Sequence, residues 1–112
     1  LILYGVNDII EGSSPGDVAA SVESIVEQSK NNQTVPVVAT YPIPVGGHAM
    51  FAGSVMAFND ELRSMASRQG VVIVDLESAF GDNATDLLSS DGLHPNDEGT
   101  ELMASTFANV LM

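Results

Sequence analysis

Asp91 and His94 have the residue types and the spacing of an acid–base pair. In Asp91-Gly92-Leu93-His94-Pro95 the carboxylate precedes the imidazole by three residues, on a turn marked by glycine and proline. An imidazole that deprotonates a nucleophile needs one free ring nitrogen and an acceptor for the other, which a nearby carboxylate supplies. The alternative is an ordinary loop, with an aspartate that caps a helix and a histidine on the surface.

A second polar cluster, Gly5-Val6-Asn7-Asp8, follows an apolar run at the start of the chain. A side-chain amide placed just beyond a strand can donate a hydrogen bond to a developing oxyanion, and Asn7 has that position. The alternative is a simple turn, because Asn, Asp and Gly all favour turns.

Three apolar runs predict the strands that would position these residues. They are short, and each ends at a Gly, Pro or Asp, as expected for strands of a parallel sheet that is covered on both faces. These runs are Leu1 to Tyr4, Val35 to Tyr41 and Val71 to Val74. Pro36 has no amide hydrogen, so we expect it at the first residue of its strand or on an edge.

Helices are predicted between and after these strands. Ser14 and Pro15 have the types of an N-cap and a first helical residue, and Gly70 of a C-terminal cap. The predicted helices cover Asp17 to Lys30, roughly Ser54 to Gln69, and a last segment that begins at Asn96 or Asp97. Their expected apolar positions are Val18, Val22, Ile25 and Val26; then Met56, Leu62, Met65 and Ala66; and finally Leu102, Met103, Phe107, Val110 and Leu111. We expect Leu76 to Leu93 to be irregular.

Alternating strands and helices indicate an α/β domain with a parallel sheet and right-handed crossovers. Reactive groups in such sheets gather at the carboxyl ends of the strands. The segment with Asn7 follows the first strand, Pro42 to His48 the second, and Asp75 the third. We therefore expect these polar residues at one rim of the sheet. His48 is either part of a pocket or a solvated loop residue.

Composition excludes several classes of protein. Three basic and fifteen acidic residues give a formal charge of −12, which disfavours nucleic acids and anionic membranes as partners. No apolar run approaches the roughly 18 residues that span a membrane. The absence of cysteine excludes disulfides and thiolate ligands, and fits a secreted or periplasmic protein without establishing the compartment. Asp82 to Asp86 lacks the ligand pattern of a calcium loop.

The two polar segments together resemble signature segments of the SGNH (GDSL-type) hydrolases. The resemblance implies a flavodoxin-like three-layer α/β/α fold and hydrolysis of an acyl ester, in a carbohydrate or a lipid, through a serine acyl-enzyme. It also implies that His94 is the catalytic base, Asp91 orients it, and Asn7 donates to the oxyanion. Because this chemistry needs neither a metal nor an organic cofactor, we expect none.

The chain departs from this family at its nucleophile. The Gly-Asp-Ser segment normally precedes Gly-x-Asn-Asp, as does a further glycine segment, and neither occurs here. None of the serines weighed as replacements follows a strand in the manner of a positioned nucleophile. These are Ser13, Ser14, Ser54, Ser89 and Ser90.

We therefore expect residues 1–112 to be roughly the C-terminal two-thirds of one hydrolase domain that lacks its first two strands. Such a chain would be nearly inactive by itself. The alternative is a non-catalytic α/β interaction or structural module that retains the fold. Without those strands, Leu1 to Tyr4 would form a bare edge. We expect that edge to produce a homodimer, a strand-swapped assembly, or a complex with an N-terminal fragment.

Overall fold

The sheet of this protein is short and parallel. The computed structural model describes residues 1–112, with strands β1 (Val37–Ala39) and β2 (Val72–Val74) paired in parallel. On the other side of β1, Ile2 forms an isolated parallel bridge with Val38. Its amide donates to the Val37 carbonyl at 2.6 Å, and its carbonyl accepts from the Ala39 amide at 3.0 Å. The predicted parallel arrangement is therefore present.

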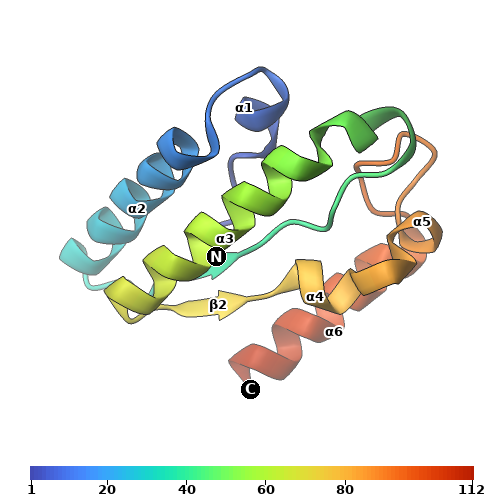
Figure 1. The fold of residues 1–112 in the computed structure, drawn as a ribbon. Helices are drawn as coiled ribbons and strands as arrows, with labels where there is room; N and C mark the ends of the chain where they lie inside the picture. The colour runs from blue at the N-terminus through green and yellow to red at the C-terminus, as the bar shows by residue number, and fades with distance from the viewer.

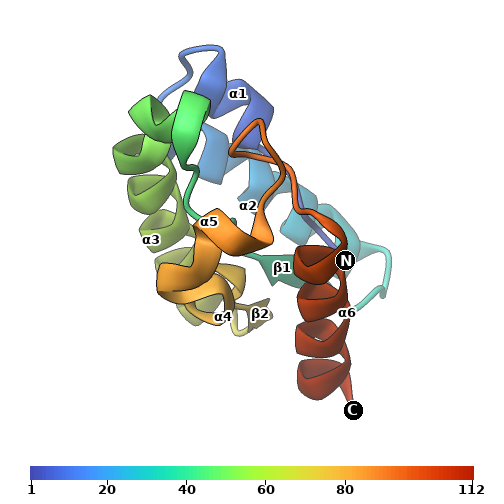
Figure 2. The same ribbon diagram turned by 90° about the vertical axis from the view of Figure 1, so that its right-hand side faces the viewer.

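Helices cover both faces of the sheet, which gives three layers (Figures 1 and 2). Because successive residues of a strand point to opposite faces, Val38 packs into the core formed with α2 and α3. Its neighbours Val37 and Ala39 lie in the other core, which α6 covers with Met103 and Phe107.

Helices α2 (Pro15–Asn31) and α3 (Ala52–Gln69) form one layer. The Ser14 hydroxyl accepts a hydrogen bond from the Asp17 amide at 3.2 Å, and Gly70 ends α3 with a φ of 65°. Both caps are confirmed. Met56, however, is 49 % exposed, and the predicted burial of this residue is wrong. The buried positions of α3 are Val55, Phe58, Asn59, Leu62, Met65 and Ala66.

The segment from Leu76 to Leu93 is not irregular, contrary to the sequence-based expectation. It contains α4 (Leu76–Phe80), the 3₁₀ helix η2 (Gly81–Asn83) and α5 (Ala84–Leu87). Leu76, Phe80, Ala84 and Leu88 recur every four residues and are all buried. Helices this short depend on tertiary packing for stability, and here α4 and α5 pack against α6.

Three further elements complete the chain. They are α1 (Val6–Ile10), the 3₁₀ helix η1 (Gly46–Phe51) and α6 (Asp97–Leu111). The predicted cap of the last helix is confirmed, since Asn96 Oδ1 accepts from the Gly99 amide at 2.9 Å. The end of α6 projects away from the rest of the molecule (Figure 2). Val110 and Leu111 are accordingly exposed, although their spacing predicted burial. No helix combines the length and the apolar character that crossing a membrane requires.

The expectation that Leu1 to Tyr4 is a strand buried on both faces is wrong. Leu1 is 68 % exposed and Tyr4 is 47 % exposed. Only Ile2 makes ladder hydrogen bonds, so the peptide groups of Leu1 and Leu3 that face the opposite direction are available to another strand.

We propose that this apolar edge pairs with a second strand, in a homodimer or strand-swapped assembly of the 112-residue chain. Sedimentation equilibrium of the pure chain is then expected to give a mass of twice 11.7 kDa or more. Replacing Leu3 by proline, which removes an outward-facing amide hydrogen, is expected to shift the protein toward the monomer. A wild-type chain that sediments as a stable monomer would contradict the proposal.

Candidate active site

Asp91 and His94 form a hydrogen-bonded pair. Asp91 Oδ2 lies 2.6 Å from His94 Nδ1. A carboxylate can only accept, so His94 Nδ1 carries the hydrogen and the neutral ring presents the lone pair of Nε2. The His94 side chain is 72 % exposed, and the carboxylate is therefore its main orienting contact.

The other carboxylate oxygen of Asp91, Oδ1, accepts three hydrogen bonds. Oδ1 accepts from the Ser89 hydroxyl at 2.8 Å, from the Leu93 amide at 2.9 Å and from the His94 amide at 3.0 Å. The hydrogen bond from the His94 ring, followed by these three, holds the pKa of the Asp91 carboxyl well below its usual range. Asp91 is consequently ionised at neutral pH and is a constant acceptor for His94.

The turn that carries this pair is fixed at both ends. Leu88 and Pro95 form an isolated antiparallel bridge, and the Ser89 amide donates to the His94 carbonyl at 2.7 Å. Gly92 has a φ of 73°, and a Cβ atom there would overlap the Val45 carbonyl oxygen. Glycine is required here both for the backbone conformation and for the close approach of the neighbouring loop.

Asn7 lies at the start of α1, directly after a second glycine with an unusual backbone. Gly5 has a φ of 117°, and a Cβ atom there would lie 2.6 Å from Val18 Cγ1 and 2.8 Å from Phe58 Cζ. The backbone therefore runs close against α2 and α3 before it turns into α1. This path brings Asn7 to the end of the sheet where His94 lies.

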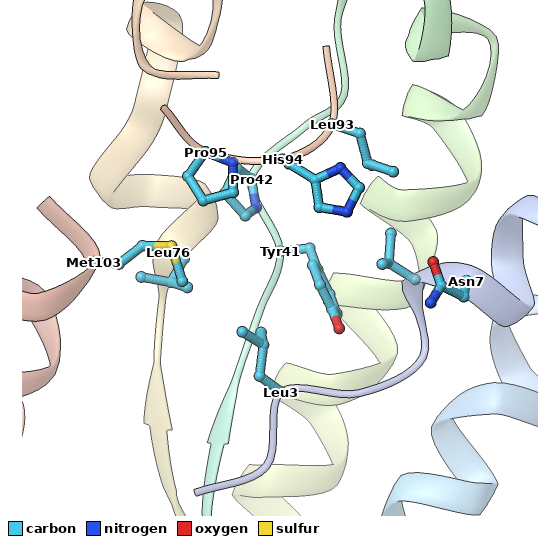
Figure 3. Close-up of a pocket in the computed structure, with 10 residues that line it drawn as sticks. Leu3, Asn7, Tyr41, Pro42, Leu76, Leu93, His94, Pro95 and Met103 are labelled. Atoms are coloured by element: carbon cyan, nitrogen blue, oxygen red, sulfur yellow. The ribbon is translucent and has the colours of Figure 1, made fainter. Parts of the chain in front are cut away.

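Asn7 and His94 line the same pocket, although they lie near opposite ends of the sequence. The pocket has a volume of about 230 Å³. Figure 3 shows both side chains at this pocket, with the Tyr41 ring below His94 and to the left of Asn7. The complete lining consists of Leu3, Val6, Asn7, Tyr41, Pro42, Leu76, Leu93, His94, Pro95 and Met103. None of these residues is a serine, and His48 is not among them.

A polar network that was not predicted from the sequence lies beside the pocket, centred on Arg63 of α3. Its guanidinium contacts Asp75 at 2.9 Å and Glu77 at 2.8 Å. The buried Thr40 hydroxyl donates to Asp75 at 2.9 Å, and Asn59 bonds both the amide and the carbonyl of Tyr41. The network joins the ends of β1 and β2 to α3 and so fixes the segment that contributes Tyr41 to the pocket.

Because of this network, the free energy of unfolding is expected to decrease at acidic pH. Partial burial raises the pKa of Asp75, but hydrogen bonds from Arg63, Thr40 and Ser78 outweigh it and hold the pKa at about 2. The folded-state pKa lies below the unfolded one, so the contribution is complete above about pH 4 and is lost as the pH falls toward 2. After solvent screening we expect it to be about 1 kcal/mol.

Urea unfolding at neutral pH and near pH 2 would measure this contribution. Wild type is expected to lose about 1 kcal/mol more than Asp75→Asn over that interval, because both proteins share every other titrating group. Equal losses in the two proteins would show that Asp75 is not stabilised in its ionised form.

The chain belongs to the GDSL-like lipase/acylhydrolase family, which its sequence matches over residues 1–102. No curated protein was found to match it. Solved structures of this family have the same α/β fold. A lipolytic G-D-S-L family protein from Veillonella parvula is 18% identical with a TM-score of 0.81, over 95% of this chain and 58% of its own.

Two esterases are similar to the same degree. A variant of Axe2, an acetyl-xylooligosaccharide esterase from Geobacillus stearothermophilus, is 18% identical with a TM-score of 0.81, over 96% of this chain and 56% of its own. The acetyl xylan esterase AlAXEase is 17% identical with a TM-score of 0.81, over 98% of this chain and 65% of its own. The chain thus spans about three fifths of the length of these structures.

Proposed function

We propose that residues 1–112 supply the base, its orienting carboxylate and one oxyanion donor of a serine ester hydrolase. The observation that carries the proposal is the 2.6 Å pair between Asp91 and His94 beside a pocket that Asn7 also lines. The nucleophilic serine comes from residues outside this sequence, since no serine of the chain lines the pocket. The free edge at Leu1 to Tyr4 offers a place for the strand that would carry it.

The chemistry follows from the free Nε2 of His94. As the serine oxygen bonds to the ester carbonyl carbon, its proton passes to Nε2, and the resulting imidazolium is stabilised by ionised Asp91. The carbonyl oxygen becomes an oxyanion that accepts from the Asn7 amide. Cleavage of the C–O bond releases the alcohol, which takes the proton from His94. Water then attacks the acyl carbon while its proton passes to His94 Nε2; the bond from this carbon to the serine oxygen breaks, the acid is released, and the serine oxygen takes the proton from His94.

A small acyl group is the substrate that we favour, with an acetylated carbohydrate as the leaving group. The lining is mostly apolar and the volume of about 230 Å³ is modest, which suits a short acyl chain. Two of the similar structures are described as esterases that act on acetylated xylan or xylo-oligosaccharides. These structures support the substrate class by fold alone.

The test compares two proteins in the hydrolysis of 4-nitrophenyl acetate. The 112-residue chain is expected to react at the background rate, because base and oxyanion donor act on a nucleophile that it lacks. A chain extended by the coding sequence ahead of Leu1, where that sequence contains a strand and Gly-Asp-Ser, is expected to turn over the ester.

Two outcomes would contradict the proposal. Hydrolysis by the 112-residue chain that His94→Ala abolishes would mean that the nucleophile lies within it. An extended chain that contains Gly-Asp-Ser, folds and shows no esterase activity would favour the alternative of a non-catalytic module.

A further inference from the structure

His48 holds the backbone of the turn that carries the Asp91–His94 pair. It lies in η1, is half-buried, and places its Nδ1 atom 2.6 Å from the Asp91 carbonyl oxygen. A carbonyl only accepts, so His48 Nδ1 must carry the hydrogen. The ring also packs near Phe51, with 6.1 Å between the ring centroids. His48 is therefore neither part of the pocket lining nor an unattached loop residue.

A second hydrogen bond joins the same two loops. The Val45 amide donates to the Gly92 carbonyl at 2.8 Å, so η1 and the residue before it bind two consecutive carbonyls of the turn. The two loops lie so close together at Gly92 that a Cβ atom there would overlap the Val45 carbonyl oxygen. The position of the Asp91 backbone is thus set from outside its own turn.

We propose that His48 is a positioning residue for the acid–base pair and acts through the Asp91 backbone. The His94 ring is mostly exposed and depends on Asp91 for its orientation. A movement of the Asp91 backbone would therefore change the orientation of the ring. The hydrogen bond from His48 restrains the Asp91 backbone, while the hydrogen bonds to Oδ1 restrain the Asp91 side chain. The proposal rests on the proposed function, because it gives His48 a role only if His94 is the base.

The chain is well suited to a direct test, because it contains only two histidines. Nitrogen-15 NMR of the rings reports which nitrogen of each neutral imidazole carries the hydrogen. In wild type, both His48 and His94 are expected to be in the Nδ1–H form. A His48 ring in the Nε2–H form would overturn the proposal without any variant.

Two matched substitutions then separate hydrogen bonding from packing. His48→Asn keeps a donor near the position of Nδ1, whereas His48→Asp has the same size and, when ionised, only accepts. With His48→Asn, His94 is expected to remain almost entirely in the Nδ1–H form, as in wild type. With His48→Asp, we expect a mixture of both tautomers and faster exchange of the Nδ1 hydrogen. An unchanged His94 spectrum in folded His48→Asp would overturn the proposal.

Asp91→Asn distinguishes this inference from the function on which it rests. This substitution is expected to abolish the preference of His94 for the Nδ1–H form, whatever His48 does. If Asp91→Asn has no effect, the acid–base pair itself is wrong. If Asp91→Asn acts and His48→Asp does not, only the role of His48 is wrong.

Discussion

Replacement of His94 by alanine is expected to lower kcat about 10⁴-fold in a chain that joins residues 1–112 to the nucleophile segment. The serine then has no group to accept its proton, and the alcohol leaves without a general acid. KM is expected to change little, because the imidazole acts on the reacting atoms and the acyl group contacts the apolar lining. Steady-state kinetics with an activated acetyl ester would measure both constants.

A matched pair of carboxylate substitutions serves as the control for this result. Asp91→Asn keeps the size of the side chain, but the amide oxygen stays with the three donors that now bond Oδ1, so its NH2 group faces His94 Nδ1. An NH2 group donates, which favours the wrong tautomer of His94 and should reduce kcat almost as much. Asp86→Asn makes the same chemical change at an exposed residue of α5 and is expected to leave kcat within about twofold. Similar losses of kcat in Asp91→Asn and Asp86→Asn would mean that the negative charge of the surface, rather than the Asp91–His94 pair, controls the rate.

Replacement of Phe58 by alanine is expected to cost about 3–5 kcal/mol of the free energy of unfolding. Phe58 is fully buried in the core between α2 and α3, contacts the backbone at Gly5, and lies 6.3 Å from the Tyr41 ring between centroids. Its removal leaves a cavity that this crowded region fills only in part. Domains are stable by only about 5–15 kcal/mol, so the loss is a large part of the total.

Urea unfolding of Phe58→Ala beside Phe107→Ala measures this effect. Phe107 is only half-buried, on the part of α6 that covers the sheet, and its replacement is expected to cost less than half as much. Equal costs at the two positions would show that the principal core does not lie between α2 and α3.

Local signals explain why much of the fold could be predicted. Ser14 and Asn96 cap helices through contacts three residues away, and two of the three short apolar runs contain the strands β1 and β2. The spacing of Asp91 and His94 was sufficient to predict their pairing, because a single turn joins them.

Contacts between remote residues explain what could not be predicted. His48 donates to a carbonyl oxygen 43 residues away. Arg63 forms ion pairs with Asp75 and Glu77, which follow the next strand, β2. Neither partner is indicated by sequence spacing. The exposure of Tyr4 and Leu111 also depends on which elements cover them, and apolar spacing alone does not determine that.

A crystal structure of residues 1–112 joined to the proposed nucleophile segment, with a phosphonate bonded to the serine of that segment, tests most directly whether Asn7 and His94 serve one acyl carbon. We expect the phosphonyl oxygen about 2.7–3.1 Å from Asn7 Nδ2. We also expect His94 Nε2 within about 3.2 Å of the serine oxygen, with Nδ1 still on Asp91. A phosphonyl oxygen bound by other groups while Asn7 points away, or a His94 ring detached from Asp91, would contradict this account.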